Sequence, residues 1–385
     1  MGSVEVIPIS LPRDIKRFVQ TWFPIYENDP HWVPPLLFDR KRFLDPGTNP
    51  YFEVAQVQCF VATLEGRDVG TIAAVVDTLY QDHEPGTGFF GFFEFIDDAT
   101  VADALFGEAR RWLIAQGMKR AIGPFNFNTN HEFGLLVEGF DSDPYVLNPH
   151  NSAYYPAIYE SLGLRKAMDW YAYRVDADMP GIQKIRRVGE RILARQPEIR
   201  VRPLDLANYA AEVDRLHAIY DDAWEQNWAH VRVTDAEFEF LAAGLKQIID
   251  PDLCFVVEIG GRVVGMSITL PDLNQAVKKM NGRLFPFGWV HLLFRKRHID
   301  RVRVFMLGIA QEFQHLPLGA VLYARTFNKA VEKGLAKGEA SLILENNIRM
   351  RGALEKMGAT VEKTYRNYEI DFFGISTGES RDEQN

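Results

Sequence analysis

The sequence predicts an α/β protein built from two tandem domains, each a central mixed β-sheet flanked by helices. Two observations carry this prediction: the chain repeats itself at an offset of 195 residues, and each copy alternates strand and helix patterns in the same order. A third observation is length, because 385 residues exceed what a single hydrophobic core commonly organises.

The repeat is clearest in two pairs of segments. Residues 59–70 read CFVATLEGRDVG and residues 254–265 read CFVVEIGGRVVG, which match at seven of twelve positions. Residues 152–163 align with residues 347–358 at the same offset. A period this long indicates a duplicated domain, because solenoid repeats recur every 20–50 residues or so.

The repeat sets the predicted domain boundaries. The halves run over 1–176 and 199–373, and a linker with a basic connecting helix over 177–198 joins them. The polar residues 374–385 are expected to form a flexible tail.

Both halves show the same order of elements. Alternating apolar residues bounded by glycine predict a β-hairpin, and then a strand, a long helix, a strand, a short helix and a last strand follow. In the first half these elements are 57–64, 68–77, 89–96, 100–116, 119–125, 152–162 and 167–175. In the second half they are 253–259, 262–270, 302–309, 318–334, 339–345, 347–357 and 360–372.

Each half also carries one long connection that the other lacks, over 126–150 in the first half and 272–301 in the second. Long connections inside compact domains are commonly functional, so we expect substrate contacts in both. Cys59 and Cys254 occupy equivalent places in the two copies, and we interpret both as small apolar core residues.

Composition excludes several classes of protein. Acidic residues outnumber basic ones 52 to 43, a balance that disfavours binding to nucleic acid through phosphates. Two cysteines disfavour a disulfide scaffold. We find no signal-peptide pattern and no apolar run of membrane-spanning length, and therefore expect a cytoplasmic protein.

Three motif matches lack the context that their chemistry requires. Gly86–Gly91 satisfies G-x-G-x-x-G, but a polar loop precedes it and a strand follows it. Gly374–Gly378 satisfies the nucleophile-elbow pattern, but no His follows it. His131 and Glu132 lack the second His of a zinc protease, and no other spacing resembles a metal site, so no metal is predicted.

The element order resembles the GNAT acyltransferase superfamily in a tandem double arrangement. In that family the strand before the long helix runs into Q/R-x-x-G-x-G/A, whose N–H groups hold the pyrophosphate of coenzyme A. A helix N-terminus suits this task because its free N–H groups attract phosphate. In the second half Pro317 replaces one glycine of the motif. The resemblance implies an acyl-CoA donor substrate and no tightly bound cofactor. The donor would be held by Leu307, Gln314, Leu318, Gly319, Ala320 and Asn347. The resemblance also implies that the parallel strands 302–309 and 339–345 splay apart to admit the pantetheine and expose a backbone N–H near Leu307 to the thioester oxygen.

The first half departs from this pattern. Asp97 and Asp98 stand where the phosphate loop should be, and their carboxylates would repel a pyrophosphate. We interpret Asp98 as a helix N-cap. The sequence therefore predicts that the second half alone binds the donor.

A tyrosine in the last helix of many GNAT domains protonates the departing thiolate. The second half has Leu354 at this position, whereas the first half has Tyr159. The reaction either proceeds without this tyrosine, or another group such as Tyr365 or Tyr368 on the last strand supplies the proton.

The resemblance places the acceptor between the early helices and the hairpin loops of the second half. There Glu225 or His230 is predicted as general base. For each predicted contact, ordinary packing or turn chemistry is the alternative. Predicted acceptor contacts are Asn227, Trp228, Asp272 and Asn274, together with Asn130, His131 and Glu132 of the first half.

The stretch 284–298, LFPFGWVHLLFRKRH, joins an apolar run to a basic end. This pattern is typical of a cover over an acyl chain or of a patch that meets anionic lipid, and a core strand is the third reading. It favours a long-chain acyl donor or a lipid-like acceptor, and on the lipid reading the protein would make peripheral contact with the inner face of a membrane.

The leading hypothesis is an acyl-CoA-dependent N-acyltransferase in which the amine of a small-molecule or lipid-like acceptor attacks the thioester directly. One alternative is a transferase that uses aminoacyl-tRNA, although the negative charge of the chain disfavours a nucleic-acid partner. The other alternative is a non-catalytic acyl-CoA-binding protein.

Overall fold

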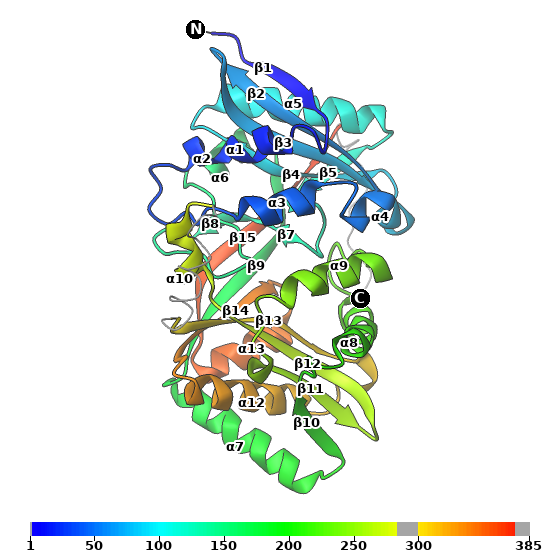
Figure 1. Cartoon of the computed structure of the whole chain (residues 1–385), viewed down its shortest axis with the longest axis vertical. Coiled ribbons are helices and arrows are strands. Elements are labelled where there is room, and N and C mark those ends of the chain that lie inside the picture. Colours follow the sequence, from blue (N-terminus) through cyan, green and yellow to red (C-terminus); the bar gives the residue numbers. More distant parts are fainter. Residues whose placement is uncertain (1, 283–298, 374–385) are drawn as a thin grey trace.

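The computed structural model of the chain describes residues 2–282 and 299–373. Within them one sheet of 13 strands runs through both halves in the order β1-β2-β3-β4-β5-β15-β9-β14-β13-β12-β11-β10, with β8 paired to β15. Figure 1 shows the first half above, the second half below, and β9 and β15 running from one to the other.

The first half contains every element that the sequence predicts for it. Its strands are β1 (Glu5–Ile9), β2 (Ala55–Leu64), β3 (Arg67–Asp77), β4 (Thr87–Phe95), β5 (Arg120–Gly123), β6 (Phe125–Asn126), β7 (Glu132–Phe133), β8 (Leu135–Glu138) and β9 (Arg165–Asp176). Its helices are α1 (Ile15–Gln20), α2 (Trp22–Ile25), α3 (Leu37–Leu44), α4 (Thr78–His83), α5 (Ala99–Ala115) and α6 (Tyr155–Ser161), with a 3₁₀ turn at Pro50–Glu53.

The second half repeats this order after the connecting helix α7 (Pro180–Arg195). Its strands are β10 (Ile199–Pro203), β11 (Cys254–Ile259), β12 (Arg262–Pro271), β13 (Arg301–Ile309), β14 (Lys337–Leu344) and β15 (Thr360–Asp371). Its helices are α8 (Tyr209–Trp224), α9 (Asp235–Leu245), α10 (Asn274–Val277), α12 (Leu318–Glu332) and α13 (Ile348–Met357), with 3₁₀ turns at Pro251–Leu253, Lys278–Met280 and Gln311–Phe313.

The halves exchange their last strands, which the sequence did not predict. β9 ends the first half but lies beside β14 of the second, and β15 ends the second half but lies beside β5 of the first. β9 and β15 also pair with each other, antiparallel, from Thr360 opposite Arg174 to Glu369 opposite Arg165. The boundaries 1–176 and 199–373 therefore describe the repeat in the sequence, whereas each half of the sheet is completed by the other.

Helices cover the sheet on the faces that the apolar patterns predict. α5 packs on β2 and β3, and α12 packs on β11 and β12. The basic helix α7 runs along α12 at the end of the molecule farthest from the first half. The absence of a side chain at Gly189 permits this close contact. A Cβ atom at this position would lie 2.6 Å from the Cβ of Ala324, which is too close for two carbon atoms.

Both cysteines are buried and free, as their equivalent places in the two copies predict. Among residues 2–282 and 299–373, no helix is long and apolar enough to cross a bilayer. The predicted interfacial stretch 284–298 and the predicted tail 374–385 lie outside the described residues.

Candidate active site

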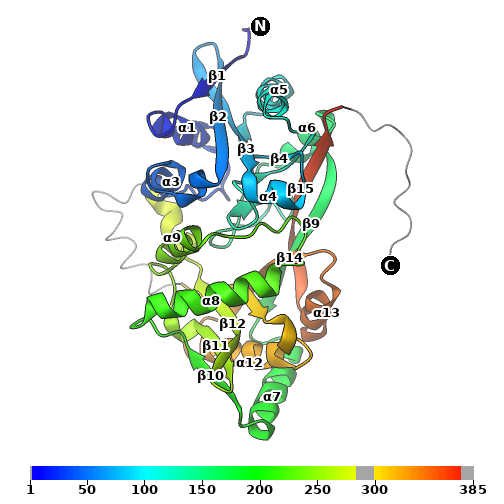
Figure 2. The same cartoon turned by 90° about the vertical axis from the view of Figure 1, so that its right-hand side faces the viewer.

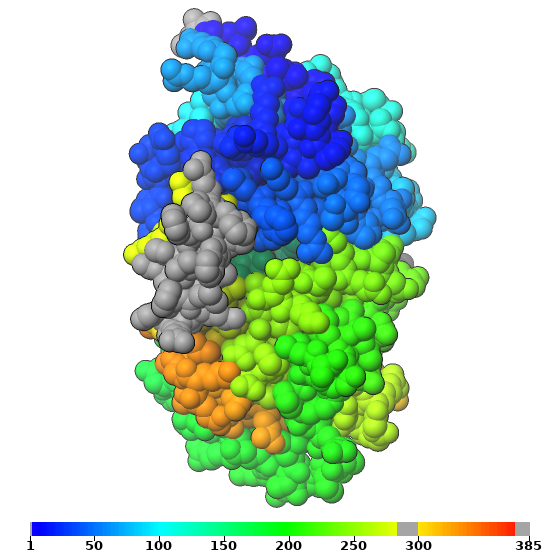
Figure 3. All heavy atoms as spheres, viewed as in Figure 1, coloured from blue at the N-terminus to red at the C-terminus, as the bar shows by residue number. Residues whose placement is uncertain are grey.

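A cavity of about 440 Å³ lies between the two halves of the molecule. In the space-filling view the surface is hollowed between the blue first half and the yellow-green part of the second (Figure 3). Figure 2 shows α9 facing the first half across the same region. The wall is mainly apolar and includes Trp22, Trp32, Phe43 and Phe92 of the first half and Phe240, Leu245, Leu273, Phe305 and Met306 of the second.

At the floor of this cavity, two neighbouring strands of the second half diverge. β13 and β14 pair in parallel only from Arg301 opposite Lys337 to Val304 opposite Ala340. Beyond Val304, β13 continues through Phe305 and Met306, which line the cavity, and past Leu307 to its end at Ile309. The predicted divergence of these strands is confirmed, and among residues 2–282 and 299–373 it leaves this edge of β13 without a strand partner beyond Val304.

The loop after β13 leads to the start of α12. Pro317 precedes the helix and contributes no side-chain cap. The space beside Gly319 is open, since a Cβ there would have its nearest neighbour, Ile309 Cδ1, at 3.9 Å. The guanidinium of Arg349 donates to the carbonyl of Gln314, which adds a positive charge to the loop. An uncapped helix start beside a cation suits an anion.

Two of the residues predicted to bind the acyl-CoA donor, Gln314 and Asn347, use their side chains for hydrogen bonds to the backbone of the chain. Gln314 Nε2 donates to the carbonyl of Ile309 at 3.2 Å. Asn347 caps α13, with its Oδ1 accepting from the N–H of Met350 at 3.0 Å. Both side chains therefore shape the loop and the next helix.

The equivalent region of the first half is filled by its own side chains. The parallel pairing of β4 and β5 ends at Phe89, just as the pairing of β13 and β14 ends at Val304 in the second half. Here, however, the N–H of Phe92 donates to Asn126 Oδ1 at 2.6 Å, and the N–H of Phe95 donates to the hydroxyl of Tyr155 at 3.1 Å. The hydroxyl of Tyr154 donates to the carbonyl of Phe95. The edge of β4 is therefore already hydrogen-bonded.

The start of α5 in the first half is also occupied. Asp98 caps the helix, as predicted, with its carboxylate accepting from the N–H of Thr100 at 2.8 Å. This interaction lowers the pKa of Asp98 because the hydrogen bonds from Thr100 stabilise the charged form. A carboxylate that stays charged at this helix start disfavours a second anion.

Glu94 supplies a carboxylate to the cavity wall. It lies on β4 and accepts hydrogen bonds from the hydroxyls of Tyr26 at 2.5 Å and Tyr155 at 2.9 Å. Burial raises the pKa of Glu94 to about 7, and the two tyrosine hydrogen bonds oppose this rise. A carboxylate with a pKa near 7 can take and release a proton at neutral pH, which is what a general base requires.

Other polar groups also line the cavity, and two of them, Arg40 and Glu132, act electrostatically on Glu94. Glu132 pairs with Arg40 of α3, and both side chains line the wall. Asn130 also lines the cavity, and its side chain bonds the carbonyl of Val231 and the hydroxyl of Tyr220. The cavity therefore combines a mainly apolar wall with polar side chains that include Glu94, Arg40, Glu132 and Asn130.

His131 lies in the same wall, but its side chain is 1% exposed. The rings of Phe43, Tyr51 and Phe127 pack against its imidazole in T-shaped pairs. Burial lowers the pKa of His131 to about 3, and burial raises that of Glu237, 3.3 Å away, to about 8. Both groups are neutral at pH 7, and His131 contributes packing to the wall.

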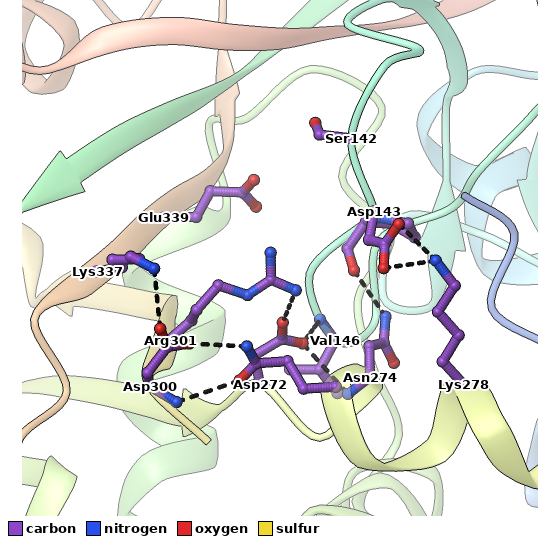
Figure 4. A network of polar contacts seen from close by, with 12 residues as sticks. Ser142, Asp143, Val146, Asp272, Asn274, Lys278, Asp300, Arg301, Lys337 and Glu339 are labelled. Carbon is purple, nitrogen blue, oxygen red and sulfur yellow. Dashed lines mark hydrogen bonds and ion pairs between the residues drawn. The ribbon is translucent and has the colours of Figure 1, made fainter. Parts of the chain in front are cut away.

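Asp272 and Asn274 hold protein groups in place. Asp272 is fully buried, pairs with Arg301 at 2.5 Å and accepts from the N–H of Val146 at 2.9 Å. Asn274 Nδ2 donates to the carbonyl of Pro144. Figure 4 shows how these bonds attach the first-half connection to the second half.

The other residues predicted as catalytic or acceptor-binding do not line this cavity, as far as residues 2–282 and 299–373 define it. Glu225 is exposed at the end of α8, 3.4 Å from Gln311 Nε2. Asn227 and His230 share a backbone turn, and burial lowers the pKa of His230. Trp228 stacks on Phe125 in the interior. Tyr159 is fully buried in the first-half core.

The structure thus brings together Asn130, His131, Glu132 and Asn274, and it adds Glu94, which was predicted only as part of the strand 89–96. One signal for Glu94 was available: it is the lone charge in the aromatic strand 89–95, FFGFFEF. A carboxylate in an otherwise apolar strand requires partners or a function.

Two curated relatives resemble this chain over nearly its whole length. "Bacterial ceramide synthase" from Caulobacter vibrioides (strain NA1000 / CB15N) is 39% identical over 378 residues, which cover 96% of this chain and 97% of the relative. Protein YghO from Escherichia coli (strain K12) is 35% identical over 368 residues, or 92% of each chain. No family model matches the sequence.

Among solved structures, a tandem GNAT protein from the clavulanic acid biosynthesis pathway superposes with a TM-score of 0.57. The match covers 96% of this chain and 98% of that protein at 11% sequence identity. It confirms the tandem GNAT fold that the element order predicts.

Proposed function

Because the chain belongs to the family of the bacterial ceramide synthase and is an N-acyltransferase of tandem GNAT fold, we propose that it transfers a long-chain acyl group from coenzyme A to the amine of a lipid-like acceptor. A ceramide is the amide of a fatty acid and a long-chain amino alcohol. The observation that carries the proposal is the cavity between the halves, whose mainly apolar wall includes the carboxylate of Glu94. The apolar part of this wall suits hydrocarbon chains, and the carboxylate suits an ammonium group.

We assign the acyl-CoA donor to the second half. The phosphates of coenzyme A would contact the start of α12 at Leu318, Gly319 and Ala320, where the N–H groups have no side-chain cap. The pantetheine would follow the unpaired edge of β13, and the N–H near Leu307 would face the thioester oxygen. The hydrogen-bonded edge of β4 supports this assignment, because the first half offers no equivalent edge.

Glu94 replaces Glu225 and His230 as the proposed general base. The acceptor enters as an ammonium and gives one proton to the Glu94 carboxylate, which leaves a nucleophilic lone pair on nitrogen. Nitrogen then bonds to the thioester carbon, the C–S bond breaks, and the nitrogen loses its second proton. The thiolate takes one proton to become the free thiol, so each turnover yields one amide, one thiol and one proton.

Product analysis tests this function. The purified chain is incubated with palmitoyl-CoA and a long-chain amino alcohol, and the products are separated by mass spectrometry while free thiol is measured. The proposal expects one N-acyl product for each thiol released. Thiol release without amide would indicate a hydrolase, and tight binding of palmitoyl-CoA with neither product would indicate a binding protein. Charged tRNA as the active donor would support the aminoacyl-tRNA alternative.

Contact with a lipid surface is a further part of the proposal, because both chains of such a product are apolar. The sequence prediction rests on 284–298, which lies outside the described residues. Vesicles that contain anionic lipid should therefore bind the protein, and added salt should weaken the binding. Equal binding to neutral and anionic vesicles would contradict the electrostatic part of this prediction.

A further inference from the structure

Leu147 is the exception in a buried segment. Its neighbours Tyr145, Val146 and Asn148 are each less than 10% exposed, whereas Leu147 is 36% exposed and lines the cavity between the halves. Its φ angle is +62°, a left-handed conformation that bulky residues rarely adopt. The chain therefore places a leucine where a glycine would fit with less strain, and directs its side chain away from the protein core.

Buried bonds on both sides hold Leu147 in this conformation. On one side the N–H of Val146 donates to Asp272 at 2.9 Å, and its carbonyl accepts from Arg303 at 2.7 Å. On the other side Asn148 Nδ2 donates to Glu339 at 2.6 Å. Figure 4 shows Val146 beside Asp272 and Arg301, with Glu339 nearby. Strain in the backbone persists only where the surroundings enforce it in this way.

Two of these three anchors, Arg303 and Glu339, come from the strands that diverge at the floor of the cavity, and Asp272 directly follows β12. Arg303 lies on β13 and Glu339 lies opposite it on β14, one pair before the parallel pairing ends. Leu147 belongs to the first half by sequence, yet it is attached to the second half at the point where β13 and β14 diverge. Phe305 and Met306, which follow on β13, line the same cavity.

We propose that Leu147 determines which acyl chains the enzyme accepts, by bounding the path of the acyl chain where it leaves the thioester and enters the cavity. This inference rests on the proposed function, since it assumes an acyl donor on β13. Leu147 would therefore take no part in the reaction itself and would not be needed for folding. The strained conformation is explained because a leucine here fills space that a glycine would leave open.

Two substitutions test the proposal in opposite directions. Leu147→Gly removes the side chain and the backbone strain together, so the melting temperature should stay equal or rise. Leu147→Phe keeps the strain and extends the side chain into the cavity. Val331→Phe on α12 is the matched control, because Val331 is exposed outside the cavity.

The readout is kcat/KM for acyl-CoA donors of increasing length with one fixed amine, together with calorimetric affinities for the same donors. Leu147→Phe should lower the ratio of long to short donors by at least about tenfold, the order that small changes in an apolar pocket produce. Leu147→Gly should raise the relative rate for longer or branched chains. Val331→Phe should keep the wild-type ratio.

The outcomes separate the inference from the proposed function. Absence of acyl transfer by the wild-type chain would overturn the proposed function itself. An active wild type with unchanged donor ratios in both Leu147 variants would overturn the inference alone. A change in preference for amine length with no change for acyl length would also overturn it, as would a marked loss of melting temperature in Leu147→Gly.

Discussion

Replacing Glu94 with glutamine removes the proposed base while preserving the shape of the cavity wall. The amide oxygen of glutamine can still accept from Tyr26 or Tyr155, which both donate to Glu94 Oε2 in the native chain. The substitution should therefore leave the fold intact and abolish one proton transfer. Loss of a general base lowers kcat by about 10²–10⁴.

The same change should stabilise the protein at alkaline pH. Burial raises the pKa of Glu94 from 4.5 to about 7, so the folded state holds this proton more tightly than the unfolded state. Stability from this group is present below pH 4.5 and is lost as the pH rises to 7. The shift corresponds to about 3 kcal/mol at 1.36 kcal/mol per pKa unit. Glu94→Gln should gain up to about this amount relative to wild type at pH 8.5, and little at pH 4.

Two assays measure these opposite effects. The rate of amide formation by the wild type should rise with pH through about 7 as Glu94 loses its proton, and Glu94→Gln should lack this rise. Urea unfolding at pH 4 and pH 8.5 gives the stabilities. Glu239→Gln, at an exposed position of α9, is the control for loss of one carboxylate. A wild-type pH profile retained in Glu94→Gln would refute the assignment of the base.

Three further predictions follow from the site. Tyr155→Phe removes a hydrogen bond that lowers the pKa of Glu94, so the rise in rate with pH should move upward by about one unit or less; an unchanged midpoint would contradict this. Gly319→Glu should weaken calorimetric binding of acyl-CoA by about 100-fold or more, while Asp98→Asn leaves it unchanged, and the reverse result would place the donor in the first half. His131→Ala should lower the free energy of unfolding by about 2–4 kcal/mol, because it empties a site packed against three rings, and a stability equal to wild type would exclude that packing role.

Local patterns in the sequence predicted the elements well. The hairpins around Cys59 and Cys254, the long helices and the cap at Asp98 all depend on residues close in the chain, and the structure confirms each. The divergence of β13 and β14 was also predicted, because it follows from the resemblance to a family with that feature.

The strand exchange could not be predicted from the same patterns. β9 and β15 are both long strands that end a half, and either could complete its own sheet or the other. The choice depends on contacts between segments far apart in the chain, about which alternation of apolar residues says nothing.

The main polar group of the site was missed for a related reason. The pKa of Glu94 depends on burial and on Tyr26 and Tyr155, which are distant in sequence and meet it only in the fold. The conformation of Leu147 was equally hidden, since leucine normally avoids positive φ and only the bonds of its neighbours enforce it.

In the proposed enzyme, a single site takes its acyl donor from the second half and its general base from the first. A crystal structure of the Glu94→Gln variant with a non-hydrolysable acyl-CoA analogue and a long-chain amine tests this most directly. We expect the pyrophosphate at the start of α12, the acyl chain in the cavity between the halves, and the amine nitrogen beside residue 94. A pyrophosphate bound at the start of α5, or an amine bound at Glu225 and His230, would contradict it.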